Sequence, residues 1–357
     1  MFDDESLELD KISLPKVDPN CSVFNECGGC SYQDVSYQDE LIIKQRKLQT
    51  LLSKDTDLSG VIFDDVVPSP QPYNYRHRLD LKLKRTKEGV VFIGFTAKKG
   101  RGVIPIEDCP IGMQAVSDFI PQLKKEAIEA LTPKYRQANL VVRTGDDGRV
   151  FWGGIGKRSL RMNESDYLWT EIRERKIYYA METFFQANLS ILPLLFDAID
   201  ALNIFNKETT FYDLYGGVGF FGLGLIDSVR DVVHIENAKA SVELARYNVK
   251  KHALENFQVI EGDVEEELPP ILKAVGSGRK IAMIDPPRAG LSDQSRDFIT
   301  NLSEFEYILY LSCNPEALAR DLNDFIKKDW NVERIIPFDF FPKTKHLETL
   351  VIMHRGE

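Results

Sequence analysis

The sequence lacks long apolar runs, internal repeats and low-complexity tracts. Of its 357 residues 43% are hydrophobic, yet no stretch approaches the ~20 consecutive apolar residues of a membrane span. The acidic start is unlike a secretion signal. We therefore expect a globular, cytoplasmic protein of two or three domains that does not enter a membrane.

Positive charge is outweighed by negative charge, because 55 Asp and Glu stand against 45 Lys and Arg and the net charge is -10. Such a balance argues against nucleic-acid binding, which selects lysine and arginine. The distribution argues the other way, since residues 73–101 carry nine basic and two acidic side chains beside Tyr73, Tyr75 and His77. A solvated charged face and an RNA-binding surface both remain open from this pattern alone.

Cysteine is also scarce, and four of the five cysteines can form one set: Cys21, Cys27, Cys30 and Cys109. In a cytosolic chain such a group indicates a metal site or catalysis more often than disulfides. No histidine lies close to the first three cysteines. The spacing alone is equally compatible with zinc and with an iron–sulfur cluster.

The pattern along the chain divides it into three parts. Residues 1–20 form an acidic tail, residues 21–182 read as an α+β domain, and residues 183–357 alternate apolar strands with helices. The last pattern predicts an α/β, Rossmann-like doubly wound sheet that is mainly parallel. Expected strands are 79–84, 90–95, 140–143, 150–152, 211–215, 232–235, 257–260, 281–284, 307–311, 332–338 and 350–353, and expected helices are 38–52, 116–131, 238–252 and 316–326.

A glycine loop at residues 213–219 (DLYGGVG) follows one of these strands and opens a helix. Glu236 ends the next strand, where a carboxylate can accept both ribose hydroxyls, and Asp263 follows the third, near an expected adenine. The loop lacks the full GxGxxG spacing of NAD sites, and we expect its first residue, Asp213, to suit the charged end of S-adenosylmethionine. Taken alone, Glu236 is equally a neighbour of a helix N-cap.

Cys313 lies between a predicted strand and a predicted helix, in the run SCNP (312–315). A thiol at a helix N-terminus is expected to have a lowered pKa, which favours a nucleophilic thiolate. Asp285 begins the rigid turn DPPR (285–288), and Glu348 precedes the final strand. A lone cysteine or glutamate is usually structural, and Asp-Pro-Pro turns also serve amino methyltransferases, so these motifs matter only together.

Taken together, the motifs resemble the RNA (uracil-5-)-methyltransferase family. They are FFQAN (184–188), DLYGGVG (213–219), DPPRAG (285–290), SCNP (312–315) and FPxTxHxE (341–348). The resemblance implies Cys313 as nucleophile and Glu348 as base. It places five further residues around S-adenosylmethionine or the target base: Gln186, Tyr215, Glu236, Asp263 and Asp285. Gly216 and Lys343 depart from the residues common in the family, without removing a catalytic group.

The same resemblance favours iron and sulfur over zinc at the cysteines. The pattern Cys-x5-Cys-Gly-Gly-Cys with a distant fourth cysteine resembles the 4Fe–4S signature of the family, which implies Cys21, Cys27, Cys30 and Cys109 as ligands. Only 20 residues precede Cys21, so the N-terminal β-barrel domain of many relatives is not expected. The cluster is expected to support structure or RNA contact.

These interpretations predict a monomeric enzyme that methylates uridine C5 in RNA through a covalent Cys313–C6 adduct, with 23S rRNA favoured as substrate. Uridine 54 of tRNA is the second substrate. A cytosine C5- or adenine N6-methyltransferase is a different enzyme class, and an adenine enzyme would not need Cys313. A non-catalytic iron–sulfur RNA-binding protein is the remaining alternative.

Overall fold

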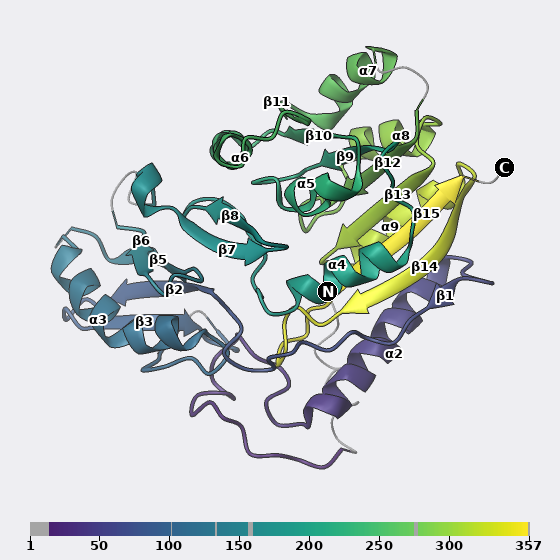
Figure 1. The fold of residues 1–357 in the computed structure, drawn as a ribbon. Helices are drawn as coiled ribbons and strands as arrows, with labels where there is room; N and C mark the ends of the chain where they lie inside the picture. The colour runs from purple at the N-terminus through teal and green to yellow at the C-terminus, as the bar shows by residue number, and fades with distance from the viewer. Residues whose placement is uncertain (1–13, 101, 133, 156–159, 275–277, 356–357) are drawn as a thin grey trace.

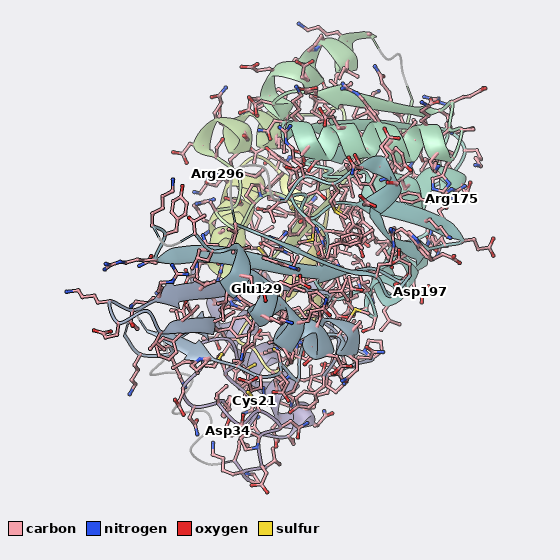
Figure 2. All side chains as sticks on the ribbon, turned by 90° about the vertical axis from the view of Figure 1, so that its left-hand side faces the viewer. Cys21, Asp34, Glu129, Arg175, Asp197 and Arg296 are labelled. Carbon is pink, nitrogen blue, oxygen red and sulfur yellow. The ribbon has the colours of Figure 1, made fainter. Side chains whose placement is uncertain are left out.

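The computed structural model describes residues 14–100, 102–132, 134–155, 160–274 and 278–355. Figure 1 shows a large sheet with helices on its faces, and beside it a smaller sheet formed by the earlier part of the chain. Within the described residues, no helix combines the length and apolar character that crossing a membrane would need. In the side view of Figure 2, Cys21 and Asp34 lie together toward one end of the molecule.

In the described part of the chain, the large sheet has eight strands in the order β1-β14-β15-β13-β12-β9-β10-β11. Neighbours are parallel except where β15 pairs with β13 and β14. The mainly parallel α/β sheet predicted for the later part of the chain is thereby confirmed. The strands are β1 (Ile62–Phe63), β9 (Thr210–Leu214), β10 (Asp231–Glu236), β11 (Phe257–Glu261), β12 (Lys280–Ile284), β13 (Tyr307–Ser312), β14 (Trp330–Phe338) and β15 (Glu348–Arg355).

Both faces of this sheet are buried, which explains why its central strands read as continuous apolar runs. Along β12 alternate side chains enter two different cores, so Ile281 and Met283 face one layer and Ala282 and Ile284 the other. The first layer includes α4 (Leu192–Ala201), α5 (Phe220–Leu225) and α6 (Lys239–Lys251). The second includes α2 (Tyr37–Asp55), α7 (Val264–Ala274), α8 (Asp293–Asn301) and α9 (Pro315–Ile326).

The smaller sheet is antiparallel, with five strands in the order β4-β3-β2-β5-β6 within the described ranges. Its elements are β2 (Arg78–Arg85), β3 (Val91–Thr96), β4 (Val103–Pro105), α3 (Gln114–Ala130), β5 (Gln137–Thr144) and β6 (Val150–Gly153). The apolar side chains of β2 pack with those of α3 on one face, so the alternating side chains Arg78, Asp80, Lys82 and Lys84 point to the other. The hairpin of β7 (Leu168–Ile172) and β8 (Arg175–Tyr179) lies between the two sheets (Figure 1).

An early segment of the chain belongs to the large sheet. Strand β1 pairs in parallel with β14, and Leu41, Leu48 and Leu52 of α2 join the core beneath α9. The remaining strands of that sheet all begin at residue 210 or later. The domain ranges 21–182 and 183–357 stay a prediction, with residues 37–63 packed against elements of the later range.

Candidate active site

Four predicted site residues lie at the carboxyl ends of neighbouring strands of the large sheet. Tyr215 follows β9, Glu236 ends β10, Asp285 follows β12, and Cys313 follows β13. These strands are parallel, so their ends meet at one edge of the sheet, where ligands of open α/β sheets bind. The fold therefore brings together residues that are spread over about a hundred positions of sequence.

The glycine loop is tied to the neighbouring strand by Glu236. One carboxylate oxygen accepts a hydrogen bond from the backbone N–H of Gly217 at 2.9 Å, and the other accepts from Ala238 N–H at 2.7 Å. Glu236 thus has the structural role expected of an acid beside a helix start, because it binds the backbone there. Its contact with a ribose stays a prediction. Asp263 lies on the same edge, where its Oδ1 accepts from Asn237 Nδ2 at 2.7 Å.

Asp213 requires a correction. Its side chain is fully buried, and Oδ2 accepts from the N–H of Gly222 at 3.0 Å while lying 3.2 Å from His234 Nδ1. The expectation that Asp213 meets the charged end of the cofactor was wrong because its carboxylate is bound inside the fold. The same packing explains Gly216, where an added Cβ would lie 2.2 Å from His234 Nδ1.

Asp285 is the carboxylate that faces the site. Gln186, which is almost fully buried, donates from Nε2 to its Oδ2 at 3.1 Å. Burial raises the pKa of Asp285 to about 7, with Asp213 and Glu236 adding to the increase and the Gln186 hydrogen bond opposing it. A nearby cation would stabilise the ionised form and lower this pKa, so the pair can bind a positively charged group.

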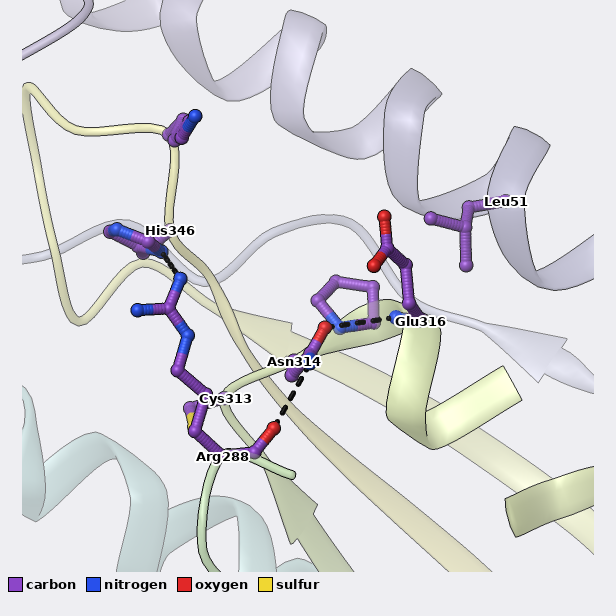
Figure 3. A pocket seen from close by; sticks show the side chains of 8 residues that line it. Leu51, Arg288, Cys313, Asn314, Glu316 and His346 are labelled. Atoms are coloured by element: carbon purple, nitrogen blue, oxygen red, sulfur yellow. Dashed lines mark hydrogen bonds between the residues drawn. The ribbon is translucent and has the colours of Figure 1, made fainter. Parts of the chain in front are cut away.

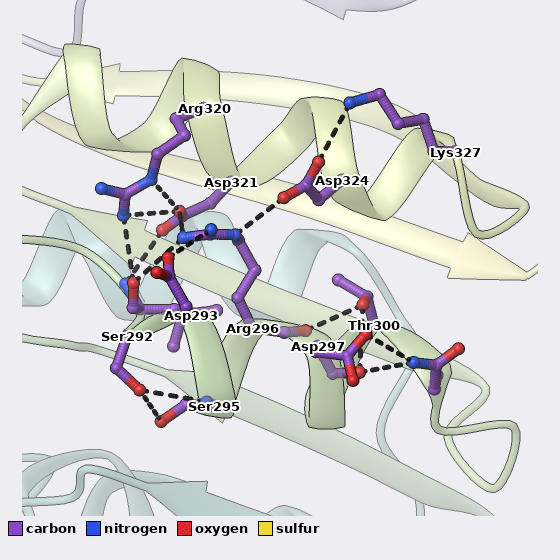
Figure 4. Close-up of polar contacts among 12 residues, drawn as sticks. Ser292, Asp293, Ser295, Arg296, Asp297, Thr300, Arg320, Asp321, Asp324 and Lys327 are labelled. Atoms are coloured by element: carbon purple, nitrogen blue, oxygen red, sulfur yellow. Dashed lines mark hydrogen bonds and ion pairs between the residues drawn. The ribbon is translucent and has the colours of Figure 1, made fainter.

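A buried carboxylate on α9 holds the turn that follows Asp285. Asp321 accepts from Leu291 N–H at 3.0 Å and from the Tyr310 hydroxyl at 2.7 Å, and Arg296 and Arg320 surround it (Figure 4). Arg320 also donates to the carbonyl oxygen of Ala289 at 3.0 Å.

This support was not predicted from the sequence. Its signal was a polar residue, Asp321, between Leu318 and Leu322 on the apolar face of a predicted helix.

Cys313 lines a small pocket at the start of α9 (Figure 3). Asn314 caps this helix, accepting from Glu316 N–H at 3.2 Å, and its Nδ2 donates to the Arg288 carbonyl at 3.0 Å. Arg288 and His346 approach each other across the pocket at 3.4 Å. Burial lowers the pKa of His346 to about 4, and nearby cations, chiefly Arg288, add to this decrease. The imidazole is therefore neutral at pH 7.

The predicted lowering of the Cys313 pKa is corrected. Burial raises the pKa of this thiol to about 12, and Glu348 and Asp285 add to the increase, while Arg288 opposes it. The helix N-terminus is present as expected, but desolvation and two acidic neighbours outweigh it. In the free protein Cys313 is therefore a protonated thiol.

Glu348 lies next to Cys313 across an antiparallel pair of strands. Ser312 at the end of β13 is in register with Thr349 of β15, so Cys313 and Glu348 continue that pairing by one position. Glu348 is only 5% exposed, and within the described residues its Oε2 has no hydrogen-bond partner. Burial, reinforced by Asp285, raises the pKa of Glu348 well above its ordinary value. The arrangement suits a thiol nucleophile and a proton-transferring carboxyl group.

The four remaining cysteines line one cavity of about 150 Å³ beside the smaller sheet, as their grouping predicted: Cys21, Cys27, Cys30 and Cys109. Gly28 N–H donates to Thr96 O at 3.0 Å and anchors the cysteine loop to β3. Gln33 Nε2 donates to Cys30 Sγ at 3.3 Å. Burial raises the pKa of Cys30 to about 12. Among the residues that the structure describes, no three His, Cys, Asp or Glu side chains are arranged to hold a metal ion.

The fold and the groups at its strand ends define an α/β methyltransferase. The crystal structure of Pyrococcus abyssi tRNA (uracil-54, C5)-methyltransferase in complex with S-adenosyl-L-homocysteine has the same fold, with a TM-score of 0.67 and 23% identity, over 91% of this chain and 85% of that one. The model of the tRNA (Uracil-5-)-methyltransferase family matches residues 156–356, and the chain belongs to this family. The predicted family and enzyme class are confirmed.

Relatives along nearly the whole chain agree with this assignment. A 23S rRNA (uracil(1939)-C(5))-methyltransferase RlmD of Aliivibrio fischeri is 26% identical over 98% of this chain and 85% of its own length. An uncharacterized RNA methyltransferase of Caldanaerobacter subterraneus subsp. tengcongensis is 28% identical over 99% of this chain and 88% of its own length. The similarity therefore includes the part of the chain that carries the four-cysteine cavity.

Proposed function

We propose that the protein methylates the C5 atom of a uridine in RNA through a covalent bond between Cys313 and C6 of the base. The observation that carries the proposal is the placement of Cys313 and Glu348 at adjacent strand ends, beside the Gln186–Asp285 pair. S-adenosylmethionine, bound between the glycine loop and Asp285, supplies the methyl group. The positive charge of that molecule would favour ionisation of the acidic groups around it.

The side chains divide the chemistry between them. The Cys313 thiol releases its proton to solvent and its sulfur adds to C6, which moves the electrons of the C5–C6 double bond toward C5 and O4. C5 can then take the methyl group as the carbon–sulfur bond of the donor breaks, and the rest of the donor would leave as a neutral thioether. Ionised Glu348 then removes the remaining C5 proton. The C6–sulfur bond breaks, the electrons restore the ring double bond, and Cys313 leaves as a thiolate. Phe184, which is 65% exposed and lies two positions before Gln186, is available to stack on a base that has left its helix.

The covalent step is tested with RNA that carries 5-fluorouridine at the target position. Fluorine at C5 cannot be removed as a proton, so the adduct should persist as a protein–RNA band that requires both S-adenosylmethionine and Cys313. Wild-type protein that methylates ordinary RNA but never forms this band would overturn the covalent mechanism.

We propose 23S rRNA as the substrate, following the RlmD relatives, with uridine 54 of tRNA as the second candidate. Mapping 5-methyluridine in RNA from a deletion strain and from the wild type distinguishes them. Loss of the modified base from 23S rRNA supports the first substrate, and loss from tRNA alone supports the second.

We also propose that the uncovered face of the smaller sheet contacts RNA. Lys82 and Lys84 point away from the core on β2, and Phe92 of β3, 37% exposed, is directly opposite Lys84. A row of cations beside an exposed aromatic ring suits phosphate contacts and base stacking. Arg85, in the same basic stretch, instead donates to the Leu131 and Thr132 carbonyls at the end of α3.

Changing Lys82 and Lys84 together to Ala should weaken RNA binding and reduce its salt dependence by about two phosphate contacts. Phe92→Ala should weaken binding with little change in the salt slope. The matched control is Arg85→Ala, which should change the stability of the smaller sheet more than the salt slope. Unaltered affinity in the Lys82/Lys84 variant would reject this surface.

For the cysteine cavity we propose a 4Fe–4S cluster held by all four thiolates. The support for the proposal is that four cysteine side chains line one cavity and supply the type of ligand that such clusters use, and the hydrogen bond from Gln33 to Cys30 is of the kind that tunes cluster sulfurs. Protein purified without oxygen should be brown, with iron and acid-labile sulfide in equal amounts. Colourless protein with stoichiometric zinc would overturn the proposal.

A further inference from the structure

We infer that Glu40 and Lys343 are positioning residues that hold the catalytic base Glu348 in place. These two residues are about three hundred positions apart in sequence and belong to one buried cluster of ion pairs. The inference rests on the proposed function, because it assigns the elimination step of that reaction to Glu348. The cluster comprises Glu40 and Lys44 of α2, and Asp339 and Lys343 of the segment between β14 and β15. We call it the Glu40 cluster.

The Glu40 cluster is buried and balanced in charge. Its four side chains are at most 4% exposed. Lys44 Nζ lies 2.8 Å from Glu40 Oε1 and 2.8 Å from Asp339 Oδ1, and Lys343 Nζ lies 3.3 Å from Glu40 Oε2. Two carboxylates thus face two ammonium groups, so the removal of one member leaves an uncompensated buried charge.

Lys343 is held in an unusual backbone conformation. Its φ is 66°, in the left-handed region that favours glycine, and its N–H donates to Glu40 Oε1 at 2.6 Å. The ammonium group also lies over the rings of Tyr37 and Tyr73, at 5.3 and 5.5 Å from their centroids. The side chain and the backbone of one residue are therefore fixed by the same carboxylate.

The turn at Lys343 connects the cysteine cavity to the base. On one side, the backbone N–H groups of Ser31 and Tyr32, directly after Cys30, donate to the Lys343 carbonyl at 2.8 and 3.1 Å. On the other side, the chain runs through Thr344 to Glu348, and Thr344 Oγ1 accepts from His346 N–H at 3.2 Å.

Cys313 follows the central strand β13, whereas Glu348 is the first residue of β15, directly after the segment that carries Lys343. Loosening the Glu40 cluster should therefore displace Glu348 while leaving the thiol in place. Addition and methyl transfer would continue, but removal of the C5 proton would slow. A displacement of about 1 Å at a reacting group can cost on the order of a hundredfold in rate.

The test is a single-turnover reaction with ordinary uridine RNA and S-adenosylmethionine, in which covalent protein–RNA adduct and free 5-methyluridine are both measured over time. Glu40→Gln and Lys343→Gln should each raise the ratio of adduct to product by on the order of tenfold to a hundredfold. Lys343→Arg keeps the positive charge and should restore most of the wild-type ratio. The double variant Glu40→Gln/Lys343→Gln removes one charge of each sign and should be less impaired than Glu40→Gln.

The matched control is Asp64→Asn. This change breaks the ion pair between Asp64 and Arg334, which also joins an early and a late segment of the chain but does not involve the Lys343 turn. It should leave the ratio unchanged. The inference is overturned if the folded Glu40 and Lys343 variants lose adduct and product in equal proportion, or if their ratio equals that of the wild type. Failure of the proposed function looks different, since the wild type would then form no adduct even with 5-fluorouridine RNA.

Discussion

Replacing Asp285 by asparagine should make the free protein more stable in alkaline solution and abolish methyl transfer. Asparagine keeps the shape and an oxygen that can accept from Gln186, but it carries no charge. The pKa of Asp285 is raised from 3.8 to about 7, chiefly by burial. Well below pH 3.8 the carboxyl is protonated in both folded and unfolded chains. Between about pH 4 and pH 7 it ionises in the unfolded chain but stays largely protonated in the folded one, so wild-type stability falls over this range and levels off above pH 7.

The magnitude follows from the two pKa values. The buried carboxyl costs the wild type roughly 1.5 kcal/mol at pH 5 and roughly 4 kcal/mol at pH 8, at 1.36 kcal/mol per pH unit. The stability of Asp285→Asn relative to wild type should therefore improve by roughly 2.5 kcal/mol between pH 5 and pH 8. Urea unfolding at both values, without S-adenosylmethionine, measures this difference.

A surface variant, Asp231→Asn, controls for the general effect of removing one negative charge, because this side chain is 46% exposed. An Asp285→Asn protein whose relative stability is the same at both pH values would refute the argument that burial strains this carboxylate. Retained methyl transfer by the variant would refute its role beside the methyl donor.

Three further predictions concern the groups around the thiol and the glycine loop. Glu348→Gln should accumulate the methylated covalent adduct, and release of 5-methyluridine at the normal rate would exclude Glu348 as base. Alkylation of Cys313 in the free protein at pH 8, followed by mass spectrometry, should be slow because the thiol pKa is about 12. Glu348→Gln should increase the alkylation rate, and an unchanged rate would contradict the electrostatic coupling between Glu348 and Cys313. Gly216→Ala should lower the free energy of unfolding by about 1–3 kcal/mol, because the added Cβ would collide with His234. The decrease should be smaller in a His234→Ala background, and a urea midpoint that does not shift would contradict the prediction.

The sequence was most informative where structure is local and both faces are buried. The apolar runs at 281–284 and 307–311 became the central strands β12 and β13 almost without change, because each side chain there meets a core. Helix α7 was not anticipated, since Pro269 and Pro270 stand within it. Strand β1 has only two residues, and its pairing with β14 depends on a contact across some 270 positions.

The site shows the same division. The motifs placed Asp285 and Cys313 at strand ends correctly, because a strand followed by a turn is a local pattern. The direction of the Cys313 pKa was wrong, because it depends on Glu348 and Asp285, which only the folded chain brings near the thiol. The partnership of Glu40 with Lys343 was invisible for the same reason, since neither residue has a distinctive sequence neighbourhood.

The central claim is that the sulfur of Cys313 bonds to the uracil ring, and a serine at this position tests it most directly. Cys313→Ser protein of wild-type stability should form no 5-methyluridine and no adduct with 5-fluorouridine RNA, while still binding S-adenosylmethionine and RNA. Production of 5-methyluridine by this variant at the wild-type rate would contradict the account.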